Sequence, residues 1–343
     1  MDMTPKKRRL LWGGLAAAVV VCAALVYYLF FAAFVPRGGS VYAYIDDDDT
    51  YDSVLVKLER DCGARQLAGF RLLAAATGYA DRVRPGRYRA GEGLSTLQFF
   101  RNVRGGSQSP LRLTIPQVRT MDRLAAELGK VLMNDSAAWA TAFHDSATCA
   151  DYGADTATLP CLFLPNTYEV YWNLTPRQLL GRMKKESDAY WTPARRELAE
   201  AAGLTPEEVI TLASIVDQET ANDAEKPLIA GMYLNRYRQG MKLQADPTVK
   251  FALRQFGLRR IYHAQLLTDS PYNTYRYAGL PPGPICIPAL SSIEAVLHFA
   301  PHDYLYMCAK EDFSGTHNFA ATYEEHLRNA RKYADALNDR GIK

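Results

Sequence analysis

The chain has 343 residues, of which 48% are hydrophobic and 22% are charged, so it is neither a disordered chain nor a multi-span membrane protein. Its formal net charge is +3, and four bases, Lys6 to Arg9, lie within the first ten residues. The remaining chain is neutral overall, a balance that does not suggest the basic face of a nucleic-acid-binding protein, so we expect no nucleic-acid partner.

An uncharged apolar segment follows these bases. It runs from Leu10 to Pro36, whereas a helix needs only about 20 residues to cross the hydrocarbon core of a bilayer. A cleaved signal peptide has an apolar core of only about 7–15 residues, and the aromatic residues from Tyr27 to Phe34 instead resemble a membrane-interface belt. We therefore expect a transmembrane helix over residues 10–36, with residues 1–9 in the cytoplasm by the positive-inside rule and the chain after Arg37 outside it.

A small α+β domain is predicted over residues 41–112, after a short flexible link at 38–40. The apolar spacing predicts helices at 53–65, 67–77 and 95–103, and strands at 41–45, after the turn that begins at Arg84, and at 111–115. This order of strand, two helices, strand, helix and strand suits a compact domain.

A larger, helix-rich α+β domain is predicted over residues 113–343. Helices are expected at 121–133, 136–147, 175–201, 205–221, 224–239, 291–299 and 323–337, and a buried strand at 304–308. Turn-forming pairs such as Asp246-Pro247 and Leu280-Pro predict loops between residue 240 and the helix at 291.

Two acids near the end of one predicted helix are candidates for catalysis. The helix over 205–221 starts with a strong cap, Thr205-Pro-Glu-Glu, and continues with a largely apolar run up to Asp217 and Glu219. At 100° per residue the two carboxylates fall on opposite flanks of the buried face. Partial burial near a helix C-terminus raises a carboxyl pKa, as general-acid catalysis near neutral pH requires. The helical periodicity does not choose between them, and solvated acids at a helix end are an alternative interpretation.

Two later loops combine aromatic, amide and carboxylate groups. One contains Gln244 and Asp246 before a proline, and the other contains Tyr272, Asn273 and Tyr275. Aromatic faces beside such polar groups suit sugar rings, which offer apolar C–H faces and many hydroxyls. The sequence contains no phosphate-binding loop, dinucleotide fingerprint, nucleophile elbow or metal-ligand spacing, so we do not expect a zinc site.

Taken in order, several segments resemble the endolytic murein transglycosylases (YceG-like, MltG type). The segments that carry the resemblance are Leu164-Pro-Asn-Thr-Tyr-Glu-Val, Ala213-Ser-Ile-Val-Asp-Gln-Glu-Thr, Leu234-Asn-Arg, Gly240-Met-Lys-Leu-Gln-Ala-Asp-Pro-Thr-Val, Tyr272-Asn-Thr-Tyr, Gly279-Leu-Pro-Pro-Gly-Pro-Ile and Gly315-Thr-His-Asn-Phe. Pro85-Gly-Arg-Tyr and Leu113-Thr-Ile-Pro resemble the LysM-like region of that family. The resemblance covers nearly the whole chain, the apolar segment included.

The resemblance implies a function and assigns the acid. In that family the second acid of the Ser-Ile-Val-x-x-Glu-Thr motif is catalytic, which corresponds to Glu219 here, while Gln244, Asp246, Tyr272, Asn273 and Tyr275 are candidates for substrate binding. The resemblance implies an inner-membrane lyase that cuts nascent peptidoglycan strands internally, leaves 1,6-anhydro ends and needs no metal or cofactor. Its expected partners are glycan strands, the membrane and cell-wall synthases of the penicillin-binding type.

Two alternatives to this interpretation stay open at the level of sequence. A muramidase would use Asp246 as a second carboxylate that activates water, as glycosidases with an acid pair do. A scaffold of the wall-synthesis machinery would bind glycan without cleaving it. The chemical nature of the product ends distinguishes these three functions.

Overall fold

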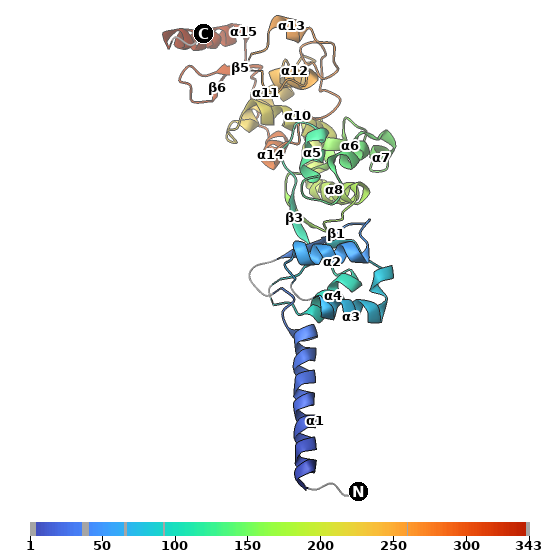
Figure 1. The fold of residues 1–343 in the computed structure, drawn as a ribbon. Coiled ribbons are helices and arrows are strands. Elements are labelled where there is room, and N and C mark those ends of the chain that lie inside the picture. Colours follow the sequence, from blue (N-terminus) through green and yellow to red (C-terminus); the bar gives the residue numbers. More distant parts are fainter. Residues whose placement is uncertain (1–4, 36–40, 65–66, 92, 259, 341–343) are drawn as a thin grey trace. The chain divides into compact units, whose positions relative to one another are not determined.

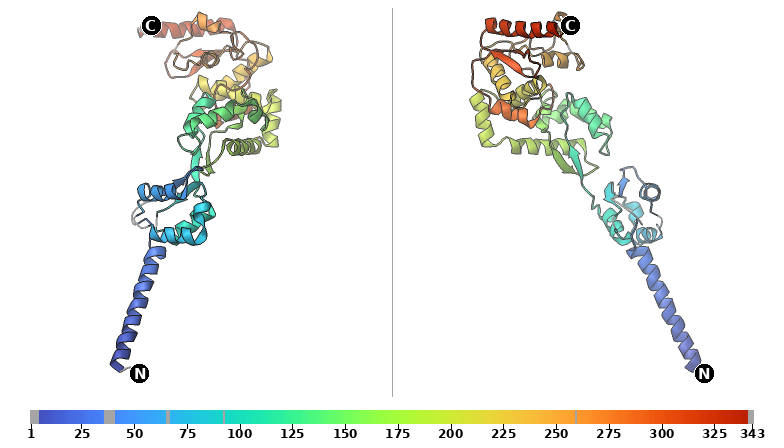
Figure 2. Two further views of the ribbon diagram at one scale, coloured as in Figure 1. Left: turned by 45° about the vertical axis from the view of Figure 1, so that its right-hand side comes forward. Right: turned by 90° about the vertical axis from the view of Figure 1, so that its left-hand side faces the viewer.

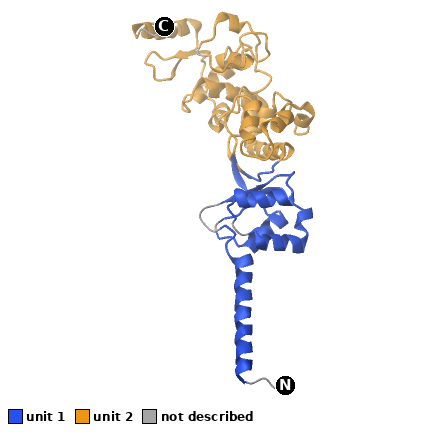
Figure 3. Ribbon diagram, in the orientation of Figure 1, with its two compact units in different colours: residues 1–113, 169–174 blue, residues 114–168, 175–343 orange. Residues whose placement is uncertain are grey.

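The computed structural model describes residues 5–35, 41–64, 67–91, 93–258 and 260–340. The chain divides into two compact units (Figure 3), the first made of residues 1–113 and 169–174 and the second of residues 114–168 and 175–343. The predicted link at 38–40 and the predicted ends of the first two helices, Pro36 and Arg65, lie outside the described residues.

The first unit begins with a long apolar helix (Figure 1). Helix α1 (Pro5–Val26) continues into a π-helical turn, η1 (Tyr27–Phe31). Among the described residues this is the one helix that is long and apolar enough to cross a membrane, with a mean hydropathy of 2.3 in its most apolar stretch. The helix ends at Phe31, earlier than the predicted Pro36, because Phe34 and Val35 are buried in the core of the first unit.

The rest of the first unit contains the predicted order of helices and strands. The elements are β1 (Tyr42–Ile45), α2 (Tyr51–Arg60), α3 (Ala68–Thr77), the 3-10 turn η2 (Tyr79–Asp81), β2 (Gly86–Arg89), α4 (Thr96–Gly105) and β3 (Leu111–Thr114). Strands β1 and β2 are antiparallel, with Tyr42 opposite Arg89. Strand β3 pairs with a later strand, β4 (Thr167–Val170), which the sequence analysis did not predict.

The second unit is mostly helical. Its helices are α5 (Met121–Leu128), α6 (Ser136–His144), α7 (Ser146–Ala150), the 3-10 turn η3 (Leu159–Leu162), α8 (Pro176–Tyr190), α9 (Pro193–Ala202), α10 (Pro206–Glu219), α11 (Lys226–Arg238), α12 (Asp246–Ala252), α13 (His263–Leu266), α14 (Leu290–Leu297) and α15 (Tyr323–Asp339). Strands β5 (Tyr306–Ala309) and β6 (His317–Ala320) form an antiparallel pair covered by α15 (Figure 2). The predicted α+β fold class is therefore confirmed.

Several predictions for this unit were wrong in detail. The helix expected over 136–147 is two helices, α6 and α7, because the backbone is extended at Asp145, which caps the second of them. The helix expected over 175–201 is two helices, because Pro193 lacks an amide donor and starts a new helix behind the capping Thr192. The helix expected over 121–133 ends at Leu128, before Gly129. The strand expected to be buried at 304–308 is β5, whose residues are only partly buried.

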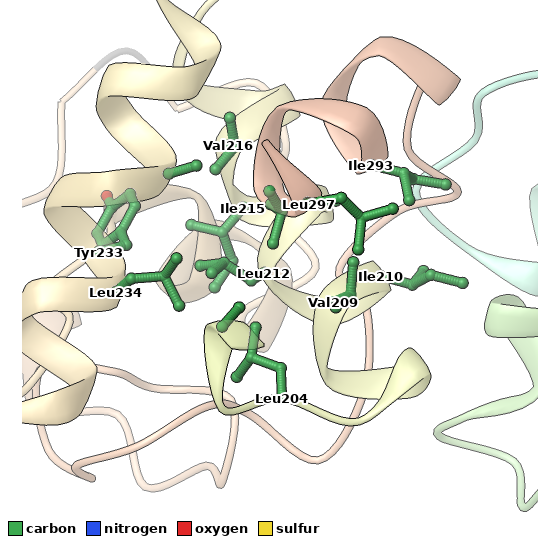
Figure 4. Close-up of a cluster of buried hydrophobic side chains, with 14 of the residues drawn as sticks. Leu204, Val209, Ile210, Leu212, Ile215, Val216, Tyr233, Leu234, Ile293 and Leu297 are labelled. Carbon is green, nitrogen blue, oxygen red and sulfur yellow. The ribbon is translucent and has the colours of Figure 1, made fainter. Parts of the chain in front are cut away.

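The core of the second unit lies between α10, α11 and α14. Leu212, Ile215 and Val216 of α10 face Leu234 of α11 and Leu297 of α14 (Figure 4), and all five side chains are almost wholly buried. Burying a large apolar side chain contributes about 1.5–3 kcal/mol. This packing fixes the C-terminal end of α10, where both candidate acids lie.

Candidate active site

Helix α10 brings Glu219 to the edge of this core. Thr205 and Glu208 form a reciprocal capping box at its start, with Pro206 at the first helical position. Residues 209–216 are all buried, and Glu219 is the last helical residue before Thr220 turns into extended backbone. The side chain of Glu219 is partly exposed, so a rigid helix end presents a carboxyl group at a surface.

Glu219 is held by one buried tyrosine. The Tyr233 hydroxyl, on α11, donates a hydrogen bond of 2.6 Å to Oε1 of Glu219, and Tyr233 itself is 2% exposed. Burial raises the pKa of the Tyr233 phenol well above its ordinary value, and the Glu219 charge adds to this effect. Tyr233 therefore stays neutral and keeps donating. Within the described part of the chain no hydrogen bond reaches Oε2 of Glu219, so that oxygen is open to a substrate.

The surroundings of Glu219 favour its protonated form. Burial raises the pKa of Glu219 above its ordinary value, and the nearby Asp246 charge raises it further. The Tyr233 hydrogen bond and the positive charges of His317 and Lys250 act in the opposite direction. The net shift is upward, which is the condition a general acid needs near neutral pH.

Asp246 and Tyr275 lie beside Glu219. Asp246 is exposed at the start of α12, and the Tyr275 hydroxyl donates to its Oδ1 over 2.6 Å. Burial, together with that hydrogen bond, raises the pKa of Tyr275, and the Glu219 charge acts on Tyr275 as well. Glu219, Tyr233, Asp246, Tyr275 and His317 are called the Glu219 cluster below.

Buried polar contacts lock the two loops together. Thr274 accepts a hydrogen bond from the backbone of Ala245 over 3.0 Å and bonds the Thr248 hydroxyl over 2.8 Å. Gln244 has a positive φ of 56°, and its side-chain oxygen accepts a hydrogen bond from Arg236. Such backbone strain is typical of functional sites. The strained segment places Asp246 opposite Tyr275.

Two of the predicted binding residues occupy other positions. Asn273 is fully buried; its amide donates to the carbonyls of Leu266 and Thr268, and its oxygen accepts from the Tyr275 backbone. Tyr272 packs on Phe251 with ring centroids 4.7 Å apart, and it does not join the Glu219 cluster. These contacts make Asn273 an organiser of the loop that carries Tyr275.

A buried carboxylate, Glu225, paired with the partly buried His317 completes the cluster. Glu225 accepts hydrogen bonds from the His317 backbone over 2.7 Å and from its Nδ1 over 2.9 Å, and the Thr220 hydroxyl also donates to Glu225. Since His317 acts electrostatically on Glu219, β6 brings a fixed imidazole to the site.

Asp217 has a different environment, although it lies only two residues from Glu219. Its Oδ1 accepts from the Ser292 hydroxyl over 2.5 Å and from the Ala289 backbone over 3.4 Å. It also forms an ion pair with Lys226 at 3.5 Å, in which both side chains are less than a tenth exposed. The structure therefore separates the two acids: Asp217 joins helices, while Glu219 keeps a free oxygen.

A hollow of about 530 Å³ begins beside Gln218, the residue before Glu219. Arg119 and Phe256 line it, and Arg119 donates to the Gln218 side chain over 2.8 Å. The Arg119 guanidinium lies 5.3 Å from the centre of the Phe256 ring. An aromatic face beside fixed polar groups can bind a sugar ring.

Four residues of the site could not be identified from the sequence: Tyr233, Glu225, His317 and Arg236. The segments Leu234-Asn-Arg and Gly315-Thr-His-Asn-Phe pointed to two of these regions. Arg236 is buried and donates to the carbonyls of Lys242 and Leu305, so it holds the loop before Gln244. In the described ranges no group of three or more His, Cys, Asp or Glu side chains could hold a metal ion.

Comparisons with known proteins give a consistent result. Residues 43–332 match the YceG-like family. The endolytic murein transglycosylase of Bacillus subtilis (strain 168) is 35% identical over 162 residues, which are 47% of this chain and 44% of that protein. The endolytic murein transglycosylase of Streptococcus pneumoniae serotype 2 (strain D39) is 27% identical over 298 residues, 78% of this chain and 53% of that protein.

The comparison of structures agrees with the comparison of sequences. A crystal structure of a YceG-like protein from Listeria monocytogenes matches 84% of this chain and 98% of its own, with a TM-score of 0.57 and 25% identity. The chain spans about half the length of the curated relatives that it matches.

Proposed function

Because this chain belongs to the YceG-like family, we propose that it is a membrane-anchored endolytic murein transglycosylase that cleaves glycan strands of peptidoglycan between N-acetylmuramic acid and N-acetylglucosamine. The observation that carries the proposal is Glu219, a carboxyl group of raised pKa held through one oxygen by Tyr233. The names of the relatives support the same activity.

The first half of the reaction needs an acid. Glu219 in its protonated form donates its proton to the glycosidic oxygen, and the bond between that oxygen and the muramoyl anomeric carbon breaks. The N-acetylglucosamine side leaves with a new hydroxyl. Burial supports this role, because it keeps the proton on Glu219 at a pH where an exposed glutamate has lost it.

The second half needs a base at the same place. The Glu219 carboxylate takes the proton of the muramoyl 6-hydroxyl, whose oxygen bonds to the anomeric carbon and gives a 1,6-anhydro end. No water is consumed, and Glu219 regains its proton. One carboxyl group serves both halves because the nucleophile belongs to the substrate. The Tyr233 hydrogen bond stabilises the carboxylate between the two steps.

A muramidase-type hydrolase is the second candidate, because Asp246 is exposed and close enough to Glu219 to raise its pKa. In that reaction Asp246 would activate a water molecule, and the products would have free reducing ends. Tyr275 already donates to Asp246, which favours a positioning role for this carboxylate. We therefore rank transglycosylation first.

The proposed place of work is the outer face of the inner membrane. The apolar helix over Pro5–Phe31 anchors the chain, and Lys6 to Arg9 keep its N-terminus in the cytoplasm by the positive-inside rule. The second unit then meets nascent strands outside the cytoplasm. An enzyme placed there would end strand elongation, with penicillin-binding synthases as partners.

The test compares two glutamate-to-glutamine variants on helix α10. Glu219→Gln keeps the size of the side chain and the Tyr233 contact but has no proton to give, so strand cleavage should fall by about 10²–10⁴-fold. Glu208→Gln makes the same chemical change in the capping box, which accepts glutamine, and should keep full activity. The measurement is the length distribution of purified glycan strands over time. A well-folded Glu219→Gln protein with full activity would remove Glu219 as the acid.

A further inference from the structure

The apolar helix is joined to the first unit without a spacer. A Cβ on Gly69 of α3 would lie 2.0 Å from the carbonyl oxygen of Leu29, so a glycine is needed where α3 meets η1. Phe34 stacks on Phe99 of α4 with ring centroids 4.5 Å apart, and Ala33 forms a β-bridge with Ser95. Helices α3 and α4 therefore both begin where the apolar helix ends.

That junction lies at the expected membrane surface. The helix over Pro5–Phe31 has 27 residues and is about 40 Å long at about 1.5 Å per residue, whereas a bilayer core is about 30 Å thick. With Lys6 to Arg9 on one polar side, the core ends near Tyr27 to Phe31. Tyr27, Tyr28 and Phe31 are more than half exposed, as residues of an interfacial aromatic belt are.

A groove rich in arginine lies between the same two helices. This arginine groove has a volume of about 770 Å³, and its walls include Arg82, Arg84, Arg101 and Arg104 against a single acid, Asp81. All four arginines are exposed. Arg84 donates to the Gly105 carbonyl, whereas Arg82, Arg101 and Arg104 form no ion pair with any described residue. Four guanidinium groups thus face one carboxylate.

The groove is close to the junction. Arg101 and Arg104 lie six and nine residues along the chain from Ser95, or about 9 and 14 Å along the helix at about 1.5 Å per residue. Figure 1 shows α3 and α4 on the side of the unit where α1 ends, with α2 on the opposite side. An arginine side chain adds several ångströms of reach toward a headgroup layer at the junction.

The outer surface of α3 also suits a membrane. Its sequence, AGFRLLAAAT, is apolar except for Arg71 and Thr77, and Leu72 is 54% exposed. Ala75 and Ala76 are exposed as well. An exposed apolar helix face beside arginines is the composition of segments that lie in the membrane interface.

We propose that the α3–α4 face of the first unit is a lipid-binding surface, with the arginine groove taking the phosphate groups of anionic phospholipids around the apolar helix. The inference rests on the proposed anchoring by that helix. Guanidinium groups form bidentate hydrogen bonds with phosphate, and each basic residue close to an anionic surface strengthens binding about fivefold (about 1 kcal/mol). This docking would hold the first unit against the bilayer.

The test measures amide hydrogen exchange of the full chain in nanodiscs. Residues 72–84 and 97–106 should exchange more slowly in phosphatidylglycerol than in phosphatidylcholine nanodiscs, and added salt should reduce the difference. The triple variant R82Q/R101Q/R104Q should lose up to about a hundredfold of that protection. It should leave exchange in α2 unchanged, which shows that the unit is folded. The matched triple variant R112Q/R328Q/R331Q changes exposed arginines outside the groove and should behave as the wild type.

Other results of this experiment would overturn the proposed lipid-binding surface. Equal exchange in the two lipids, or an unchanged R82Q/R101Q/R104Q variant, would overturn the lipid-binding surface. The same protection by inorganic phosphate in phosphatidylcholine, or by glycan strands, would assign the groove to a different ligand and overturn it too. Release of the wild-type protein from native membranes by alkaline carbonate would overturn the membrane anchoring by the apolar helix, and the lipid-binding surface with it. If the protein stays in the membrane but its hydrogen exchange does not depend on the lipid, only the lipid-binding surface would be overturned.

Discussion

At the scale of single residues, the chemistry depends on how differently Glu219 and Asp217 are partnered. Asp217 accepts hydrogen bonds from the Ser292 hydroxyl and the Ala289 backbone amide, and it forms an ion pair with Lys226. Glu219 has the Tyr233 hydroxyl on one oxygen and a negative neighbour, Asp246, that disfavours its charge. With a single donor and an acidic neighbour, Glu219 keeps its proton to a higher pH than an ordinary glutamate, because its pKa is raised.

Tyr233→Phe should move the pH profile in a predictable direction. The Tyr233 hydrogen bond lowers the pKa of Glu219, so its removal should raise that pKa further above the ordinary value of 4.5. Glu219 would then keep its proton to a higher pH, and the descending limb of kcat/KM against pH should move upward. A hydrogen bond to a charged group contributes about 1.5–3 kcal/mol, so kcat should fall about ten- to hundredfold.

The control for this variant is Tyr237→Phe on the same helix, where the hydroxyl contacts Glu208 at 3.4 Å. It should leave the pH profile and kcat unchanged. A descending limb that stays in place or moves to lower pH in Tyr233→Phe would contradict the assignment of Glu219 as the acid.

At the scale of elements, Asp217 connects helices α10, α11 and α14. Asp217→Asn leaves the buried Lys226 with one acidic partner, Asp223 at 2.7 Å. Breaking a buried ion pair costs about 3–5 kcal/mol, and since Asp223 remains we expect a loss of about 2 kcal/mol in the free energy of unfolding. The folded fraction should keep kcat within a few-fold. Chemical denaturation and initial rates measure the two quantities, and an unchanged stability with a lost kcat would show that Asp217 takes part in the reaction.

The order of elements could be predicted from the sequence, but their pairing could not. Caps and periodicity located α4 and α10 closely, because Ser95 and Thr205 start these helices with local hydrogen bonds. The pairing of β3 with β4 depends on segments more than fifty residues apart, which leave no periodic signal. Helix α12 was missed because its first residues, Asp246 and Pro247, also suit a turn.

The candidate site shows the same limit. Helical periodicity did not distinguish Glu219 from Asp217 as the catalytic acid, and only the resemblance to a family selected Glu219. Tyr233 and His317 reach it from α11 and β6, and only the packing of those elements shows that they converge. Asn273 was predicted as a binding residue from its polar type, whereas the structure uses its amide inside the loop.

At the scale of the whole molecule, the division into two units allows the proposed membrane anchor and the proposed catalytic unit to be separate parts of one chain. The division at residue 113 lies near the predicted boundary, and residues 169–174 return to the first unit, which the sequence analysis did not anticipate. The LysM-like character of residues 41–112 stays a prediction.

The proposed topology makes a direct prediction. Protease added to the outside of spheroplasts should digest the chain after Arg37, and the intact protein should remain in the membrane fraction before digestion. The expectation follows from the apolar helix over Pro5–Phe31 behind the bases at residues 6–9. A cytoplasmic protein serves as the control for spheroplast integrity. Protection of the part after Arg37 would contradict both the orientation and a substrate outside the cytoplasm.

The central claim is that one carboxyl group, Glu219, serves as acid and then as base with a nucleophile from the substrate. Mass spectrometry of the new ends made by the full chain from purified glycan strands tests it most directly. We expect 1,6-anhydromuramoyl ends within the strand, formed without incorporation of oxygen from isotopically labelled water. Free reducing ends that carry the label would contradict it and assign the reaction to a hydrolase that uses Glu219 with Asp246.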